Sequence, residues 1–499
     1  MIPVLSAEQT RQADAYTIEN EPIASIDLME RASRAFVKKF TELSERGHRI
    51  YVFCGIGNNG GDGLAISRLL KEQGYEIQVY IVGNPEKGSN DFKINLERLS
   101  NLISYTQILT REHLPQLNQT DYVVDALFGS GLSRSLEGIY AQVVSHINNA
   151  DTSVFSVDIA SGLFTDQHIV EKTIIQPTHT ISFQCPKPAF FHPSLQLFVG
   201  QWHVVDIGLD KKYIHSLPVN QYFSEQHDFK SLLPKKSVFD HKGDAGKIKL
   251  ITGSKGKIGA AVLCTRAALR TGSGLVFTQV PGCGRDVLQI SVPEAMVIED
   301  KNFEMISAID ETTFDAIGIG PGIGTHPDTA KALEKLVSNS EGPLVIDADG
   351  LNILSQNKSL LKKVPANSIL TPHPGEFKRL VGEWTDDYHK IELLQNFAQA
   401  YKFNVVLKGA YSIVCSSDGD CYYNCSGNPG MATGGSGDVL TGVIVSLFGQ
   451  TKAPFIALRL GVFLHGLAGD LAAEKIGANG MIASDIVEYL PHAIKKIQF

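Results

Sequence analysis

The chain repeats a pattern in which a short apolar run is followed by glycine or a polar residue and then by helical spacing. In "RIYVFCGIGNNGGDGLAISRLLKEQG", residues 49–74, the apolar run ends in glycines, and apolar residues then recur every three or four positions. This pattern predicts a strand, a loop and a helix. The segments "TDYVVDALFGSGLSR" and "VFSVDIASGLF" each contain an apolar strand that ends near an aspartate. Such alternation predicts a mainly parallel sheet whose ligands lie beyond the carboxyl ends of its strands.

The pattern stops between residues 211 and 245, where prolines and mixed charges replace it, so we predict a domain boundary there. A second alternating series follows, in "GKIKLITGS", "LVFTQV", "FDAIGIGPGIG", "PLVIDADGLNIL", "SILTPHPGEFKRLVG" and "FNVVLKGAYSIVCSSDGDCYYN". With 499 residues the chain is also too long for one hydrophobic core. The predicted fold class is α/β, with one domain over residues 1–215 and a second over residues 225–499.

Composition describes an ordinary soluble globular protein, with 43 % hydrophobic and 20 % charged residues. A formal net charge of −8 argues against a nucleic-acid-binding surface. Seven scattered cysteines form neither a paired CxxC pattern nor a disulfide framework, which indicates a reducing compartment. At the N-terminus there is no signal-peptide pattern, and Ser6 and Gln9 fit a capping box that opens a helix. No apolar run approaches the length of a membrane span, so we predict a cytoplasmic protein without membrane contact.

The loop "GIGNNGGDG" loosely resembles a dinucleotide-binding fingerprint, with the GxGxxG spacing starting at Gly55. A tight turn is the alternative interpretation, since a single match to this spacing is weak. The side chains favour a site, because Asn58, Asn59 and Asp62 offer amide and carboxylate groups that a plain turn does not need.

Two aspartates, Asp125 and Asp158, come near the ends of predicted strands. A single carboxylate of this kind more often pairs with a surface lysine. Together with Asn59 and Ser161, however, they supply hard oxygen ligands suited to an alkali or alkaline-earth cation.

Near the C-terminus, "GGSGD" precedes an apolar helix, and its glycines would let backbone amides approach a phosphate group closely. The role of Asp438 in this motif is open, because an aspartate at a helix N-terminus can be an ordinary cap or a chemical group. His373, between two prolines, can be structural or catalytic. Lys408 can contact phosphate or be a solvated hairpin lysine. Their joint placement at strand ends favours a nucleotide site.

The motifs "NNGGDG", "GSGLSR", "KGAYS" and "GSGD", in this order, resemble those of the bifunctional NAD(P)H-hydrate repair enzymes over nearly the whole chain. That resemblance implies a Rossmann-like three-layer epimerase domain and a ribokinase-like, ADP/ATP-dependent dehydratase domain. Such enzymes restore NADH or NADPH that has been hydrated at the nicotinamide ring. The first domain interconverts the R and S hydrates, and the second dehydrates the S form. One small departure is Ser130, where threonine is as common.

The resemblance also implies site residues in the epimerase domain. Asn59, Asp125 and Ser161 would bind potassium, and Asp158 would act on the substrate as a catalytic residue. No residue is indicated for the proton transfer. The residues that would line the hydrate-binding site are Asn58, Asn59, Gly60, Gly61, Asp62, Gly129, Ser130, Gly131, Leu132, Ser133, Arg134 and Ser135.

In the dehydratase domain, Asp438 would activate the hydroxyl of the hydrate towards the terminal phosphate of ADP, giving AMP and phosphate. Mg²⁺ would bridge the nucleotide phosphates. We expect ADP rather than ATP, because the two-domain fusion without a targeting segment is typical of prokaryotes, and we expect a homo-oligomer. Ala260, Gly322 and His373 match hydrate-contacting positions, and Lys408, Gly409, Ala410, Tyr411, Ser412 and Gly437 match the nucleotide site.

Two other classes of protein compete with this interpretation. The first is a small-molecule kinase whose N-terminal domain is a regulatory cofactor-binding module, which would release a stable phosphorylated product. The second is a binding protein in which both domains are vestigial sensors. Retention of the "NNGGDG" loop together with His373, Lys408 and Asp438 argues against the second class.

Overall fold

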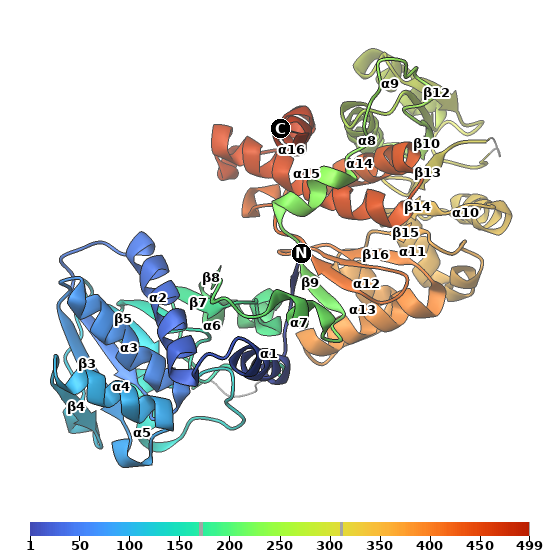
Figure 1. Ribbon diagram of the computed structural model, residues 1–499. Coiled ribbons are helices and arrows are strands. Elements are labelled where there is room, and N and C mark those ends of the chain that lie inside the picture. The colour runs from blue at the N-terminus through green and yellow to red at the C-terminus, as the bar shows by residue number, and fades with distance from the viewer. Residues whose placement is uncertain (169–172, 310–312, 499) are drawn as a thin grey trace. The chain divides into compact units, whose positions relative to one another are not determined.

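The protein has two compact units, one from Ile2 to Val219 and one from Asn220 to Phe499 with Met1 added to it. The computed structural model describes residues 1–168, 173–309 and 313–498 (Figure 1). Each unit contains a largely parallel sheet with helices packed on it, so the predicted α/β class is confirmed.

The sheet of the N-terminal unit has seven strands, all parallel, in the order β4-β3-β2-β5-β6-β7-β8. The order reverses between β2 and β5, so the loops that follow these two strands flank a crevice at the sheet edge, where α/β folds bind ligands. The strands are β2 (Ile50–Cys54), β3 (Ile77–Val82), β4 (Tyr105–Ile108), β5 (Tyr122–Ala126), β6 (Ser153–Val157), β7 (His179–Phe183) and β8 (Gln201–Val205).

Helices α2, α3 and α4 lie side by side over this sheet (Figure 1). Helix α2 buries a stripe that includes Phe36 and Phe40, spaced at three or four residues, against the sheet. As predicted, Ser6 caps α1 through its Oγ atom, and Gln9 completes a capping box. The short strand β1 (Ile2–Pro3) precedes these helices, which are α1 (Ala7–Asn20), α2 (Ser25–Leu43), α3 (Asn58–Glu72), α4 (Asn90–Ser100), α5 (Gly138–Asn148), α6 (Gln196–Val199) and α7 (Lys211–Ser216).

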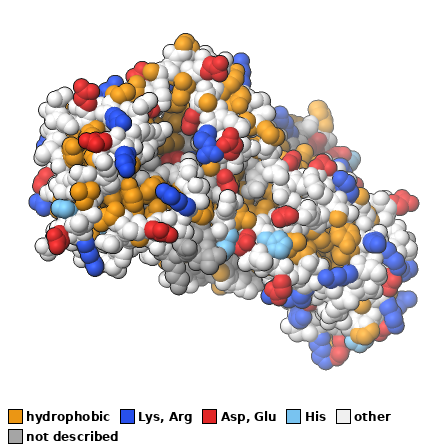
Figure 2. All heavy atoms as spheres, turned by 90° about the horizontal axis from the view of Figure 1, so that it is seen from below, with side chains coloured by type: hydrophobic (Ala, Val, Ile, Leu, Met, Phe, Trp, Pro, Cys, Tyr) orange, Lys and Arg blue, Asp and Glu red, His pale blue; other side chains and the backbone are white. Residues whose placement is uncertain are grey.

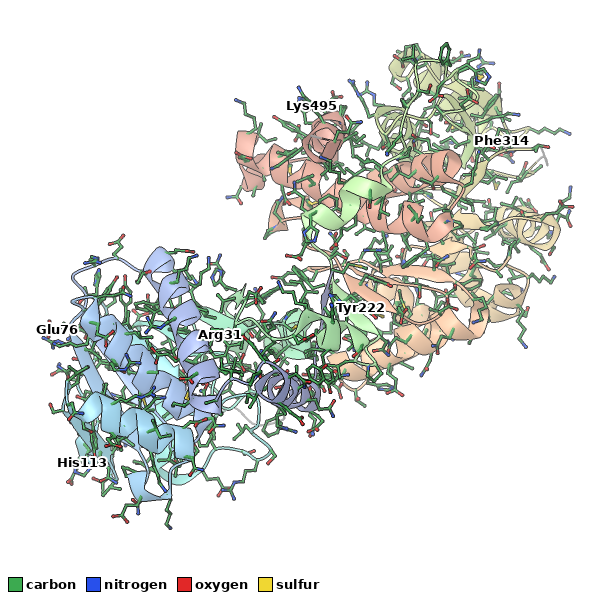
Figure 3. All side chains as sticks on the ribbon, in the orientation of Figure 1. Arg31, Glu76, His113, Tyr222, Phe314 and Lys495 are labelled. Atoms are coloured by element: carbon green, nitrogen blue, oxygen red, sulfur yellow. The ribbon has the colours of Figure 1, made fainter. Side chains whose placement is uncertain are left out.

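Arg31 ties α2 to the end of α1 and to the segment after β8 (Figure 3). Its Nη2 atom donates to Glu21 Oε1 at 2.8 Å, and its Nη1 atom donates to the carbonyl oxygen of Gly208 at 3.2 Å. Because Glu21 is the C-cap residue of α1, this arginine fixes one end of that helix.

The sheet of the C-terminal unit runs β9-β18-β17-β16-β15-β14-β13-β10-β11-β12. From β16 to β12 all neighbours are parallel, and β17 is antiparallel to both of its neighbours. The order reverses between β10 and β13. The strands are β9 (Gln221–Phe223), β10 (Lys247–Ile251), β11 (Leu275–Val280), β12 (Met296–Glu299), β13 (Ala316–Ile319), β14 (Leu344–Ile346), β15 (Ile369–Leu370), β16 (Asn404–Leu407), β17 (Ile413–Cys415) and β18 (Cys421–Tyr423).

Helix α14 is apolar on all sides, and it is buried between α8, α15 and the sheet. Burial of its large side chains contributes roughly 1.5–3 kcal/mol each, which anchors the loop at its N-terminus. The helices are α8 (Ile258–Arg270), α9 (Arg285–Ser291), α10 (Pro327–Asn339), α11 (Ala348–Gln356), α12 (Pro374–Val381), α13 (Asp387–Tyr401), α14 (Ser436–Thr451), α15 (Pro454–Ile476) and α16 (Ala483–Gln498).

One expectation needs correction. Helix α15 is long and apolar enough to cross a membrane, so it was wrong to expect no run of that length. Of its most apolar window, 72 % is buried inside the protein, as in the core helix of a globular unit. The stretch from 211 to 245, where a boundary was predicted, contains α7 and β9, and the two units divide within it, between Val219 and Asn220. Tyr222 of β9 stacks on Tyr422 of β18, with ring centroids 5.2 Å apart (Figure 3).

Acidic and basic side chains are interspersed over the face of the molecule shown in Figure 2, with apolar side chains between them. That face therefore has no continuous basic stripe of the kind that contacts a nucleic-acid backbone.

Candidate functional sites

In the N-terminal unit, the loop after β2 leads directly into α3 at the point where the strand order reverses. A Cβ atom at Gly60 would lie 1.8 Å from the carbonyl oxygen of Gly55, and one at Gly55 would lie 1.9 Å from that of Leu127. A side chain at either position would collide with the backbone, so both positions require glycine. Gly57 differs, because a Cβ atom there would have no described neighbour within 4 Å. It is the N-cap of α3, where no side-chain cap is made, so there is space beside the start of this helix.

Asp125 and Ser161 meet in the interior beside this loop. Ser161 donates its hydroxyl to Asp125 Oδ1 at 2.5 Å and its amide to Asp125 Oδ2 at 2.9 Å, and Ser156 adds a hydroxyl at 2.8 Å. Burial raises the pKa of the Asp125 carboxyl, although these hydrogen bonds oppose the shift. No lysine or arginine pairs with Asp125 among the described residues.

The side chain of Asn59 and the carbonyl group of Phe128 lie near Asp125 and Ser161 and offer further oxygen atoms that could bind a cation. Ser161 Oγ lies 3.1 Å from the Phe128 carbonyl oxygen. Asn59 packs on the next residue, since a Cβ atom at Gly129 would lie 3.4 Å from Asn59 Oδ1. Its Nδ2 atom is buried without a hydrogen-bond partner in the described residues. One carboxylate with neutral oxygens around it suits a monovalent cation better than zinc, which prefers Cys or His.

Asp158 follows β6 and is bound by a buried lysine rather than by a surface one. Its Oδ1 atom accepts from Lys187 Nζ at 2.5 Å, from the Phe183 amide at 3.0 Å and from Ser182 Oγ at 3.2 Å. Lys187 is only 1 % exposed. The backbone of Asp158 is left-handed, with φ of 66°, an uncommon conformation that marks functional positions.

The charge of Asp158 acts on two more carboxyl groups, from α1 and α3. Asp62 is partly buried, and burial, followed by the charges of Asp158, Asp14 and Asp91, raises its pKa well above the ordinary value. Burial and the charge of Asp158 raise the pKa of Asp14 to about 6, against the opposing effect of Lys187. The sequence interpretation missed Lys187 and Asp14. Lys187 could have been found from its place between two prolines after a strand, whereas Asp14 carries no such signal.

The predicted loop from Gly129 to Ser135 connects β5 to α5 and is largely exposed. The amide of Leu132 donates to the carbonyl of Gly129 at 3.2 Å and closes a turn. The side chains of Ser133 and Arg134 are exposed, as is that of Asn58. These side chains are therefore accessible to a ligand, unlike the buried Asp125.

In the C-terminal unit, Asp438 is not a helix cap. The N-cap of α14 is Gly435, with φ of 92°, and α14 begins at Ser436, so Asp438 lies in the first turn. Among the described residues its carboxylate accepts no hydrogen bond. A Cβ atom at Gly434 would have no described neighbour within 4 Å, so the loop backbone faces open space. The cap interpretation is thus wrong, and a free carboxylate stands beside an amide-lined loop.

Lys408 and Asp347 form an ion pair beneath this loop. Lys408 Nζ lies 2.9 Å from Asp347 Oδ1 and 4.0 Å from Glu376 Oε2. Thr441 of α14 donates to Asp347 Oδ2 at 2.7 Å. Burial tends to raise the pKa of Asp347, but Lys408 and the hydrogen bonds outweigh it and hold the pKa below its ordinary value. Lys408 is therefore a mostly buried cation that is ion-paired with Asp347, and not a solvent-exposed lysine of a hairpin.

These neighbouring charges shift the pKa of the Asp438 carboxyl. Burial, followed by the charges of Asp347 and Asp349, raises the pKa of Asp438 to about 6, while Lys408 opposes the shift. A carboxylate with this pKa is ionised near neutrality and still basic enough to accept a proton from a hydroxyl. Asp347, Asp349 and Glu376 were not singled out from the sequence, although "DADG" after an apolar strand could have suggested the first two.

The positions predicted to contact a hydrate are distributed around this site. A Cβ atom at Gly322, where φ is 67°, would lie 3.1 Å from Ala260 Cβ, so these two residues are adjacent. His373 is the N-cap of α12, and its Nδ1 atom accepts from the Gly375 amide at 3.0 Å. Glu376 completes a capping box with His373, whose side chain is about half exposed. The histidine therefore has a structural role, and its Nε2 atom lies 3.5 Å from Glu376 Oε1.

The predicted nucleotide positions also meet. A Cβ atom at Gly437 would lie 3.5 Å from Lys408 Nζ, which brings the first turn of α14 over the lysine. In the loop from Gly409 to Ser412, the Ser412 hydroxyl donates to the Gly409 carbonyl at 2.9 Å. Ala410 and Tyr411 form the exposed tip of this loop.

His465 of α15 contacts the backbone at the start of α14, next to the glycine loop. Its Nε2 atom lies 3.0 Å from the carbonyl oxygen of Ser436. Burial lowers the pKa of His465 to about 4, so the ring is neutral and Nε2–H donates. Sequence reasoning missed this residue, which is one polar position in a long apolar helix.

Comparisons with known proteins match both units. The family described as YjeF-related protein N-terminus matches residues 25–189, and the family described as NAD(P)H-hydrate dehydratase matches residues 248–492. A protein named bifunctional NAD(P)H-hydrate repair enzyme Nnr from Moorella thermoacetica is 34 % identical, over 99 % of this chain and 97 % of the relative. The Escherichia coli protein of the same name is 32 % identical, over 98 % of this chain and 93 % of the relative.

Among solved structures, an ADP/ATP-dependent NAD(P)H-hydrate dehydratase from Bacillus subtilis, co-crystallised with ATP and Mg²⁺, aligns with a TM-score of 0.50 and 29 % identity. The alignment covers 56 % of this chain and 100 % of that chain. This similarity supports the fold described for the C-terminal unit.

Proposed function

Because this chain belongs to the bifunctional NAD(P)H-hydrate repair enzyme family, we propose that it epimerises hydrated NADH and NADPH and dehydrates the S form. The domain limits follow the sequence, with the epimerase in residues 1–215 and the dehydratase in residues 225–499. The observation that carries the proposal is the free carboxylate of Asp438, with a pKa of about 6, beside an open glycine loop and a held lysine.

In the dehydratase reaction, Asp438 removes the proton from the hydroxyl of the hydrate. The hydroxyl oxygen then attacks the terminal phosphorus of ADP, and AMP leaves with the electrons of the broken P–O bond. The amides around Gly434 and Gly437 and the charge of Lys408 stabilise the transferred group. Loss of phosphate, with a proton from the neighbouring ring carbon, restores the ring double bond. Ala260, Gly322 and His373 would hold the ring, and the loop from Gly409 to Ser412 would hold the nucleotide.

Mg²⁺ would be held by Asp347 and Glu376. Both carboxylates are largely buried and lie within 4.0 Å of Lys408 Nζ, and their hard oxygens fit this ion. When bound, the ion would neutralise the charge of the nucleotide phosphates.

In the epimerase site, Asn59, Asp125 and Ser161 would hold potassium, because Asp125 is a buried carboxylate without a protein cation beside it among the described residues. The ion would keep the loops after β2 and β5 together. The hydrate would lie between the loop from Asn58 to Asp62 and the loop from Gly129 to Ser135, with its ring against Asp158.

We further propose ADP as the preferred donor, a cytoplasmic location and a homo-oligomer. All seven cysteines are free thiols, which fits a reducing compartment. Steady-state rates with ADP and ATP at equal concentration test the first point, and faster turnover with ATP would refute it.

The overall function is tested by mixing the protein with hydrated NADH, Mg²⁺ and nucleotide and following the absorbance of reduced nicotinamide. We expect recovery that depends on nucleotide and releases free phosphate in equal amount. Accumulation of a stable phosphorylated product without recovery would instead identify a small-molecule kinase. No change in any reactant would point to a binding protein.

A further inference from the structure

Helix α1 covers the epimerase site, although it lies outside the residues 25–189 matched by the family and carries none of the sequence motifs. Arg11 Nη1 lies 4.0 Å from the position that a Cβ atom on Gly131 would take. The Ala7 amide donates to Asp166 Oδ2 at 2.9 Å, and Thr17 Oγ1 accepts from the Asp210 amide at 3.1 Å. The two hydrogen bonds hold α1 against the segments after β6 and β8, and Arg11 brings it near the loop after β5.

Asp14 lies three residues after Arg11 and so on the same side of α1. Its side chain is partly buried, and its carboxylate accepts no hydrogen bond from any described residue. The charges that act on it are Asp158 and Lys187, and Asp14 in turn acts on Asp62. Asp14 and Asp158 therefore both interact with one buried lysine, Lys187, which is bound to Asp158, and Asp62 lies near both carboxylates.

Acidic side chains gathered at one position suit a reaction that needs a proton donor and passes through a cation. Inversion occurs at the ring carbon that carries the hydroxyl and is bonded to the ring nitrogen. When that hydroxyl takes up a proton, the C–O bond can break with its electron pair leaving on water, while the nitrogen lone pair forms a C=N bond. Water then adds to the opposite face and gives up a proton, which restores the hydroxyl with inverted configuration.

We propose that Asp14 delivers this proton to the hydroxyl and takes one back from the incoming water, while Asp158 stabilises the cationic ring. Asp14 is then a catalytic residue, and Lys187 is a positioning residue that fixes Asp158. The proposal rests on the epimerase function proposed above. A pKa near 6 for Asp14 fits this role, because the group can both give and accept a proton in the physiological range.

The test compares D14N with E19Q, which removes the charge of Glu19, an exposed carboxylate on the same helix. Interconversion of the purified R and S hydrates is measured without nucleotide, so that dehydration is off, and spontaneous inversion is subtracted at each pH. We expect the epimerase kcat of D14N to fall roughly 100- to 10,000-fold, with KM within a few-fold. D14E should recover part of the rate, and E19Q should match the wild type.

Two further measurements separate this role from a structural one. The wild-type rate should decline as the pH rises above about 6, because Asp14 must be protonated to act as the acid, and D14N should lack that decline. In water labelled with ¹⁸O, each inversion by the wild type should introduce one labelled oxygen. Nucleotide-dependent dehydration by the same D14N preparation should be normal, which reports on its folding.

The outcomes are distinguishable. Epimerisation by D14N within threefold of the wild type, or a raised KM with unchanged kcat, would overturn the assignment of Asp14. Inversion without ¹⁸O incorporation would overturn the loss of water. A wild-type protein that dehydrates but never epimerises would instead refute the epimerase function itself.

Discussion

Lys408 Nζ lies 2.9 Å from Asp347 Oδ1, and this pair joins the end of β16 to the end of β14 beneath the first turn of α14. Asp347 is 2 % exposed, so its charge depends on the lysine for compensation. The pair holds the cation where a transferred phosphate would be. The charge of Asp347 raises the pKa of Asp438, and the charge of Lys408 opposes that shift.

Replacement of Lys408 by Met should therefore act on both stability and catalysis. The uncompensated Asp347 carboxylate should lower the free energy of unfolding by about 3 kcal/mol. The KM for nucleotide should rise as well, because a phosphate contact is lost. K402M is the matched control, since Lys402 and Asp418 form an exposed pair 3.7 Å apart, expected to contribute only ~0–1 kcal/mol. Denaturant unfolding of both variants measures the difference, and equal stabilities would contradict the prediction.

Asp438→Asn should abolish dehydration and spare epimerisation. Asparagine keeps the size of the side chain but cannot accept the proton, so the dehydration rate should fall on the order of a hundred- to ten-thousand-fold, with nucleotide binding largely intact. In the wild type, dehydration should fall as the pH drops through about 6, where Asp438 becomes protonated. The measurement is both half-reactions on one preparation. Dehydration within a few-fold of wild type would show that the carboxylate is dispensable.

Asp125→Ala should weaken epimerisation and its dependence on potassium. The concentration of potassium giving half-maximal rate should rise by about tenfold or more, because the only charged ligand of the proposed set is removed. E97Q, at an exposed position of α4, is the control and should behave as the wild type. Activity of the Asp125 variant that is undiminished in potassium-free buffer would exclude the proposed cation site.

His465→Phe should loosen the glycine loop while keeping the size of the buried ring. The Ser436 carbonyl would lose its donor, which should lower the free energy of unfolding by roughly 1–3 kcal/mol and raise the KM for nucleotide. The histidine has a folded-state pKa of about 4, below its ordinary value of 6.5, so the unfolded chain binds the extra proton between these values. Wild-type stability should therefore decline as the pH falls from about 6.5 to about 4. Thermal melts in this range should show a shallower decline for the variant, and parallel curves would speak against a buried neutral histidine.

Several features of this protein could be predicted from local sequence. The Ser6 capping box, the strand that ends before Gly55 and the helix after "GGSGD" depend on residues a few positions apart, so their hydrogen bonds and apolar spacing are visible in the sequence itself. The parallel sheets follow from the alternation of such units, and this places the loops after β2, β5 and β16 at ligand-binding edges. The roles of most site residues come from the family motifs and stay predictions.

Only the tertiary structure decided which charged groups meet. Lys408 and Asp347 are 61 positions apart, and Asp158 and Lys187 are 29 positions apart, so their pairing depends on the order of strands in each sheet. Asp14 reaches its site because α1 is held against the segments after β6 and β8, and His465 because α15 packs beside α14. Burial next to other carboxylates then raises the pKa values of Asp14 and Asp438, and neither burial nor proximity between distant elements can be read from local spacing.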